Sequence, residues 1–245
     1  MGRGLVESED DLRETNPPTN RELFDTLAAE FVGRKYDVKM LIRLIMNSAT
    51  YQRSSRPTPG NEADVRFYSR YIVRRLSGEV ILDAVSQVTG VPTTFKDVYT
   101  GVEGGTAPTS NYPEGTRAVQ LPDSRVASRF LDAFGRPDRT QTCSCERTQD
   151  STVGQALMLN NGQILNDKLR SPKSLLNVWL SENLSEAEII RRAFVVALCR
   201  EPTKSELERM LGLVKNSATS ELLRREALED VIWAIATSRE FLFNH

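Results

Sequence analysis

The sequence predicts an all-α protein, an irregular multi-helix bundle with one long loop rich in glycine, proline and threonine and at most a short strand. Apolar residues recur every three or four positions along most of the chain, which is the spacing of a buried helix face. Polar residues that suit helix N-caps precede several of these stretches. The alternating patterns that are typical of strands are almost absent.

The N-terminal part of the chain combines an extended start with two predicted helices. Residues 1–18 are polar and end at two prolines, so we expect an extended lead-in there. Thr19 and Glu22 match a capping box, which predicts a helix to about Val32. Asp37 suits the N-cap of the next helix.

The middle of the chain holds the longest stretch without periodicity. Helices are expected over Glu62–Val73 and Glu79–Val88 before it. Residues 91–122 then show little pattern, so we expect a long loop with one short strand around Ala118–Leu121. A loop of this length inside a domain is usually functional or mobile. A surface insertion without a role fits the sequence equally well.

The rest of the chain returns to helical patterns, and the whole reads as one helical domain over residues 1–245. Capping boxes at Ser185 and Thr203 predict two of the helices. The predicted helices of this half are Ser124–Phe134, Val153–Leu169, Ser171–Leu180, Ser185–Cys199, Thr203 to about Lys215, and Glu221–Phe243.

Composition excludes several classes of function. A net charge of -1 over 245 residues argues against non-specific nucleic-acid binding. No apolar run approaches the roughly 18 residues that a membrane span needs, and the N-terminus lacks the apolar core of a signal peptide. The single histidine, His245, is the last residue, so imidazole metal sites and histidine-based catalytic pairs are poor candidates. We therefore predict no metal site and no catalytic residue.

A dense polar segment around two thiols is the first candidate site. A disulfide within Cys-x-Cys is strained and therefore labile, neighbouring arginines would lower a thiol pKa, and two thiolates rarely complete a metal site. Structural thiols, a redox-labile pair and metal chemistry all remain open. The charged residues and thiols of this segment are Arg136, Asp138, Arg139, Cys143, Cys145, Glu146 and Arg147.

A second group of charges has helical spacing. Arg75, Glu79 and Asp83 are four residues apart and share one face, with Arg74 beside them. They form either a solvated ion-pair face or a partly buried network that holds residues 135–150. The two carboxylates would face the same side, which does not suit glycoside hydrolysis.

Amides and aromatic residues provide further candidates. Gln155 and Asn160 lie in an apolar helical stretch, where a buried amide must be hydrogen-bonded. We expect their partners to be backbone groups of residues 135–150, and a ligand contact is the alternative. The aromatic side chains that could stack on sugars are not clustered in sequence: Phe95, Tyr99, Tyr112 and Trp179.

Four stretches carry a resemblance to a known family. They read RYIVRRLSGEVILDAVSQVTGVP, GTRAVQLPDSRVASRFLDAFGRPDR, CSCERTQDSTVGQALMLNN and SREFLFNH. In this order they resemble the planctomycete-type domain of unknown function DUF1553, or PSD, over essentially the whole chain. The family motif FGRP…C-x-C-E-R…QAL-x-LN corresponds here to Phe134–Pro137, Cys143–Arg147, Gln155–Leu157 and Leu159–Asn160. Gly78 stands where relatives tend to have alanine.

The resemblance implies a setting rather than an activity. It implies that the chain is the C-terminal part of a larger domain in an exported, periplasmic or cell-surface, multidomain protein. Any haem would belong to a cytochrome-c-like domain outside this chain, so no cofactor is expected here. The expected partners are other domains of the full-length protein, and the resemblance indicates no oligomeric state.

Three functions follow from these observations. The first is a non-catalytic helical scaffold or partner-binding domain, linked by family context to redox proteins or polysaccharide breakdown. The second is an enzyme or electron-transfer accessory that uses the Cys-x-Cys-Glu-Arg segment. The third is carbohydrate or small-ligand binding by loop 91–122, which requires a pocket between that loop and residues 135–150.

Overall fold

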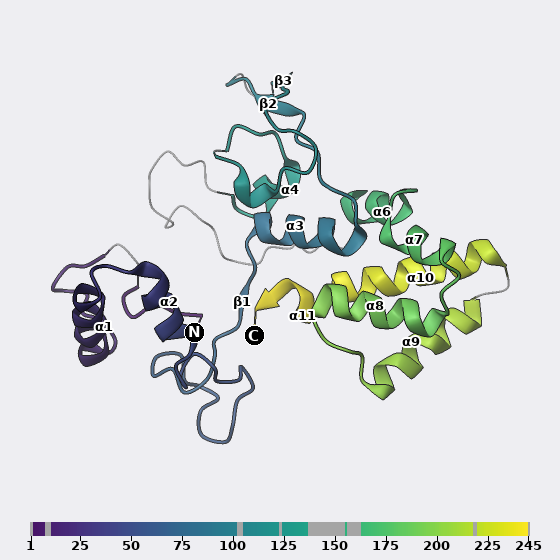
Figure 1. Ribbon diagram of the computed structural model, residues 1–245. Coiled ribbons are helices and arrows are strands. Elements are labelled where there is room, and N and C mark those ends of the chain that lie inside the picture. Colours follow the sequence, from purple (N-terminus) through teal and green to yellow (C-terminus); the bar gives the residue numbers. More distant parts are fainter. Residues whose placement is uncertain are drawn as a thin grey trace. The chain divides into compact units, whose positions relative to one another are not determined.

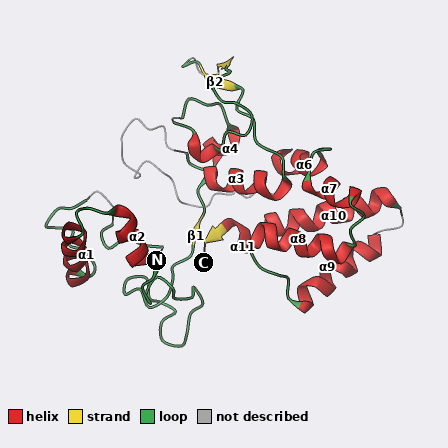
Figure 2. Cartoon of the chain, in the orientation of Figure 1, coloured by secondary structure: helices red, strands yellow, loops and turns green. Residues whose placement is uncertain are grey.

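A computed structural model of the chain describes residues 2–7, 11–101, 105–122, 124–136, 155, 163–217 and 220–244 (Figure 1). Over these residues the chain is mostly helical, and its strands form only short two-stranded sheets (Figure 2). The predicted all-α class is confirmed. Contacts divide the chain into two units, which meet in sequence between Arg74 and Arg75. Phe243 and Asn244 belong to the first unit.

The described residues of the first unit form two helices, α1 (Arg21–Gly33) and α2 (Val38–Met46). The side chain of Asp37 accepts a hydrogen bond from the Met40 amide at 3.0 Å, so the predicted cap of α2 is confirmed. At α1 the cap is Asn20, whose Oδ1 accepts from the Leu23 amide at 2.9 Å.

Thr19, the predicted cap of α1, has a different role. Its hydroxyl donates to the Leu5 carbonyl at 3.1 Å and shares a hydrogen bond of 2.8 Å with the Tyr68 hydroxyl. A side chain that joins distant segments cannot also cap the helix, so the neighbouring Asn20 takes that position. The capping-box prediction was therefore wrong by one residue.

No helix forms over the predicted range Glu62–Val73. The Asp64 carboxylate accepts backbone N–H groups of Arg66, Phe67 and Ser69 at 2.8, 2.7 and 3.0 Å, and also the Ser69 hydroxyl. Local bonds of this kind compete with a helix for the same backbone groups. They also hold the pKa of Asp64 well below its usual range, with the Phe67 bond as the largest cause.

The second unit is built around α3 (Gly78–Thr89). The helix begins at the Ser77 cap and ends at Gly90, whose φ of 72° lies in the left-handed region that glycine tolerates best. The buried side chains of α3 include the apolar Ile81, Leu82, Val85 and Val88 and the polar Glu79 and Thr89. Around it pack η1 (Ala118–Gln120), α4 (Arg129–Ala133), α6 (Gln163–Arg170), α7 (Leu175–Ser181) and α8 (Glu186–Leu198).

Residues 91–122 hold a small hairpin and a single helical turn. The antiparallel strands are β2 (Asp97–Tyr99) and β3 (Thr106–Pro108), with Val98 opposite Ala107. The strand expected around residues 118–121 is instead the 3-10 turn η1. Asp83 on α3 accepts the amides of the first two η1 residues at 2.7 and 3.2 Å, which favours a turn over an extended chain.

Helix α4 is shorter than the predicted Ser124–Phe134. It begins only after the Ser128 cap, because the preceding residues pair with the hairpin. The Tyr99 amide donates to the Arg125 carbonyl at 2.7 Å, and Val126 bridges Val98. These contacts come from residues about thirty positions earlier, which local pattern does not reveal.

The last helices form the rest of the second unit. Helix α8 packs with α9 (Lys204–Ser217) and α10 (Glu221–Ala236), which run beside it in Figure 1. The predicted caps Ser185 and Thr203 are confirmed. The expected single helix Glu221–Phe243 is interrupted after Ala236, and α11 (Arg239–Leu242) follows. The short strands β1 (Arg74–Arg75) and β4 (Phe243–Asn244) complete the described elements.

Candidate functional site

A buried side-chain amide links three parts of the second unit. Arg75 Nη1 donates to Gln155 Oε1 at 2.6 Å, and Gln155 Nε2 donates to the Ala133 carbonyl at 2.9 Å. Gln155 is only 5% exposed. The Arg75 guanidinium also lies over the Phe134 ring, 5.1 Å from its centroid, at a distance typical of cation–π contact. The amide thus joins the start of α3 to the end of α4.

Gly78 allows α3 and α4 to approach closely at the same place. A Cβ atom added at Gly78 would lie 2.6 Å from the Phe134 Cβ. Phe134 is buried and stacks on Phe130 with ring centroids 4.3 Å apart. A side chain at position 78 would therefore push against a fixed aromatic pair.

The carboxylates on α3 lie in protein rather than in open solvent. Glu79 is 9% exposed. Asp83 accepts the backbone amides of Ala118 and Val119, and its carboxylate lies 3.6 Å from Arg117 Nε. Each carboxyl oxygen of Asp83 therefore accepts one backbone amide of the η1 turn and holds this turn against α3.

Several predicted site residues lie outside the part of the chain that the structure describes. Within the described residues, no cluster of three or more His, Cys, Asp or Glu side chains could hold a metal. Cys199 is an exposed free thiol. None of the described helices has the length and apolar character needed to cross a membrane. The predicted residues outside the described ranges are Asp138, Arg139, Cys143, Cys145, Glu146, Arg147 and Asn160.

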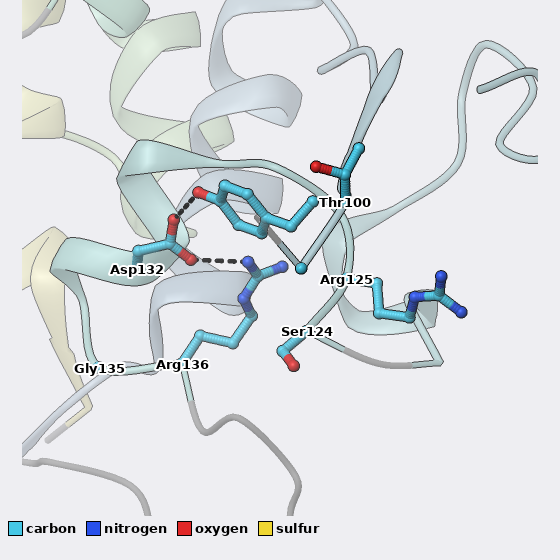
Figure 3. Close-up of a pocket in the computed structure, with 8 residues that line it drawn as sticks. Thr100, Ser124, Arg125, Asp132, Gly135 and Arg136 are labelled. Carbon is cyan, nitrogen blue, oxygen red and sulfur yellow. Dashed lines mark hydrogen bonds and ion pairs between the residues drawn. The ribbon is translucent and has the colours of Figure 1, made fainter. Parts of the chain in front are cut away.

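An open polar pocket of about 780 Å³ lies at the end of α4 (Figure 3). We call it the Arg136 pocket. Sequence reasoning singled out Arg136 and noted Tyr99 among dispersed aromatic residues, but it missed Asp132. The i, i+4 spacing of Asp132 and Arg136 was the available signal. The lining residues are Tyr99, Thr100, Gly101, Ser124, Arg125, Asp132, Gly135 and Arg136.

The helix end places Arg136 in this pocket. Gly135 has a φ of 74°, and the Arg136 amide donates to the Leu131 carbonyl at 3.0 Å, which is the pattern of a Schellman motif. The chain therefore turns back on α4. The Arg136 side chain is 5% exposed, whereas that of Asp132 is 41% exposed.

Asp132 is the electrostatic centre of the pocket. Arg136 Nη2 donates to Asp132 Oδ1 at 2.6 Å and to the Val126 carbonyl at 2.7 Å. The Tyr99 hydroxyl donates to Asp132 Oδ2 at 2.5 Å. This hydrogen bond to Asp132 is the main reason that the pKa of Tyr99 is raised.

Lys168 is a second buried charge that sequence reasoning missed. Its Nζ donates to the Val91 carbonyl at 2.6 Å and to the Ser86 hydroxyl at 3.3 Å. Burial lowers the pKa of Lys168 to about 8. On α6 it shares the buried face with Leu165 and Leu169, and this spacing was the signal in the sequence. Lys168 fixes the start of residues 91–122 to α6.

The described residues are thus mostly helical, with buried polar links between helices and an open polar pocket at the end of α4. The model of a family described as "Protein of unknown function (DUF1553)" matches residues 1–214, and the chain belongs to this family. The resemblance seen in the sequence is thereby confirmed at the level of the family. No curated protein and no solved structure matches the chain.

Proposed function

We propose that the chain is a helical scaffold that binds another domain of a longer natural protein. The supporting observation is the apolar surface of α1 and α2. Within the described N-terminal residues, neither helix has a buried residue. The exposed apolar side chains of α2 include Val38, Ile42, Ile45 and Met46, which are 37–56% exposed.

The exposed side chains of α2 form one stripe. Positions 38, 42, 45 and 46 follow the spacing of a single helix face. The narrow gap between the two helices is lined instead by Phe31 of α1 and by Met40, Leu41 and Leu44 of α2. One side of α2 therefore packs on α1, and the other presents an apolar surface of the kind that marks interaction sites.

The charge beside the stripe constrains the partner. Lys39 and Arg43 are exposed on α2, and this helix contains no acidic residue. Protein interfaces combine an apolar centre with a polar rim of complementary charge. We therefore infer that the partner domain offers an apolar groove with acidic residues at its edge.

Polar substitutions on the stripe test this function. In the double variant Ile42→Gln/Met46→Gln, we expect binding of the neutral dye Nile red to fall by at least half, because glutamine keeps the helix but removes the apolar face. Val178→Gln is the matched control, since Val178 on α7 is similarly exposed at 43%. Unchanged dye binding in the double variant, with unchanged helicity, would refute an apolar docking face.

The non-catalytic part of this proposal has its own test. Hydrolysis of glycans, esters or sulfate esters by the isolated chain, abolished by Glu79→Gln or Cys145→Ser, would overturn it. An accessory role for Cys143 and Cys145 requires a reactive thiol or a bound metal. Thiol titration with and without reductant, together with elemental analysis, separates this role from a scaffold.

The family context supports a proposal about location. We propose that the longer protein is exported and works beside redox proteins or in polysaccharide breakdown. Membership of the family is the support for this. Cell fractionation tests it, because a protein confined to the cytoplasm would contradict export.

A second function is favoured by the Arg136 pocket. We propose that residues 91–122 help to bind a small ligand. Tyr99, Thr100 and Gly101 from this region line the pocket, opposite Gly135 and Arg136. Ligand binding by loop 91–122 requires a pocket between this loop and residues 135–150, and the lining of the Arg136 pocket supports the proposal.

A further inference from the structure

We propose that the Arg136 pocket recognises a small molecule through an oxyanion, a carboxylate, sulfate or phosphate group that binds the Arg136 guanidinium. The proposal rests on the second of the two functions above, ligand binding by residues 91–122. It is independent of partner binding by α1 and α2. Oxyanions of these three kinds share one chemistry, a negative oxygen that accepts N–H hydrogen bonds.

The hydrogen bonds of Arg136 are incomplete. Nη2 donates to both Asp132 and the Val126 carbonyl. Nε and Nη1 are buried, and among the residues that the structure describes they have no acceptor. A buried charged donor without an acceptor is costly. A ligand oxygen that accepts a hydrogen bond from this guanidinium would therefore bind more strongly than a ligand oxygen that contacts an arginine in open solvent.

The orientation of the guanidinium agrees with this role. In Figure 3 the Arg136 side chain extends from the end of α4 into the space between Asp132 and Thr100, whereas the Arg125 guanidinium points away. Nε and Nη1 lie on different edges of the planar group. One oxyanion is therefore expected to bind at Nη1 rather than to bridge both nitrogens.

The charges around the pocket favour an anion over a cation. Among the described lining residues, the Arg136 guanidinium and the Asp132 carboxylate are the charged groups that face the pocket, since the Arg125 guanidinium points away. Both Asp132 oxygens already accept hydrogen bonds, from Arg136 and Tyr99. A cation would compete with these donors for Asp132 and would be repelled by the Arg136 guanidinium. Among the described lining residues, Asp132 is the group that repels an anion, and it therefore limits the affinity of the pocket for one.

Arginine side-chain resonances provide the direct test on the full chain. Sulfate, phosphate and acetate are titrated separately against chloride at constant ionic strength, and the Nε–H signals are followed by nuclear magnetic resonance. We expect the Arg136 signal, assigned by its loss in Arg136→Lys, to shift saturably with at least one oxyanion. Calorimetry in the same buffers gives the dissociation constant, and comparison of the three probes shows which oxyanion fits best.

Variants of the pocket supply the controls. Arg136→Gln should abolish the calorimetric signal. Arg136 also donates to the Val126 carbonyl, so its substitution could disturb the fold. Asp132→Asn provides a test that keeps Arg136 in place. It takes away the repelling charge, so the dissociation constant should fall several-fold. Arg129→Gln removes an exposed charge from the same helix and should change nothing.

The outcomes distinguish the oxyanion inference from the proposed ligand binding by residues 91–122, on which it rests. If a neutral sugar such as glucose shifts the Tyr99, Thr100 and Gly101 amides while no oxyanion moves the Arg136 signal, the oxyanion inference is wrong and ligand binding stands. If neither the oxyanions nor the sugar moves these signals, both are wrong. Equal oxyanion binding by the wild type and Arg136→Gln also refutes the inference.

Discussion

Arg75 and Gln155, which lie 80 positions apart in sequence, share a hydrogen bond of 2.6 Å in the interior of the second unit. The other end of the same amide holds the Ala133 carbonyl. One side chain thus joins the start of α3 and the end of α4 to the segment that contains Gln155. This arrangement assigns a structural role to residues that the sequence offered as a candidate site.

Removal of this amide should destabilise the protein. Gln155→Ala removes the hydrogen bonds to Arg75 Nη1 and to the Ala133 carbonyl, so we expect a loss of about 1–3 kcal/mol in the free energy of unfolding, measured by urea titration. Gln87→Ala, an exposed glutamine on α3, should stay within about 0.5 kcal/mol of wild type. Equal effects at both positions would show that the amide does not support the fold.

Gly78 should resist enlargement although a helix normally gains from alanine. The added Cβ would lie 2.6 Å from the Phe134 Cβ, so Gly78→Ala should cost about 1–3 kcal/mol through overpacking. Gly212 on α9 has nothing within 4 Å of an added Cβ. Gly212→Ala should therefore stabilise the protein by roughly 0.5–1 kcal/mol. Thermal unfolding of both variants checks the prediction, and stabilisation by Gly78→Ala would contradict the close packing of α3 on α4.

Lys168 should make stability rise in alkaline solution. Its pKa is about 8 in the folded protein and near the ordinary lysine value of 10.5 in the unfolded chain. Between these values the unfolded chain binds more protons, so the free energy of unfolding increases with pH. The free energy of unfolding of the wild type should therefore rise relative to that of Lys168→Met between about pH 8 and pH 10.5. Lys173→Met, at an exposed lysine, should show no such trend. A constant difference for Lys168→Met would rule out a buried amine.

Glu206 should have the opposite dependence, in acid. Arg200 binds Glu206 at 2.9 and 3.0 Å, and these bonds are the main cause that lowers the Glu206 pKa to about 2. A depressed carboxyl pKa stabilises the fold above the unfolded pKa of 4.5 and loses that contribution as the pH falls toward 2. Glu206→Gln should therefore flatten the acid limb of the stability curve, whereas Glu208→Gln, at a neighbouring exposed glutamate, should not. Parallel acid limbs for wild type and Glu206→Gln would contradict the pairing.

Local signals in the sequence predicted helix boundaries well where the cap acts within its own turn. Asp37, Ser185 and Thr203 bond to amides three residues on, so their patterns suffice. Asp64 shows the limit, because its bonds to the next few residues form a turn where apolar spacing predicts a helix. Helix α4 is shortened by pairing with the distant Val98, which no local pattern contains.

The candidate site was predictable as residues but not as an arrangement. Charge spacing singled out Arg75 and Asp83, yet their partners Gln155 and Ala118 lie far away in sequence. The pocket depends on a hydrogen bond between Tyr99 of β2 and Asp132 of α4, which lie 33 positions apart in sequence. Tertiary packing brings these distant residues together, and a single sequence does not show such contacts.

Partner binding through α1 and α2 is tested most directly by amide hydrogen exchange. The rates are compared between the chain alone and the natural protein purified from its source, with α10 as the internal reference. We expect the α2 amides to exchange at least tenfold more slowly in the natural protein, because a docked domain covers Val38, Ile42 and Met46, while α10 is unchanged. Equal rates for α2 in both samples would contradict docking on this face.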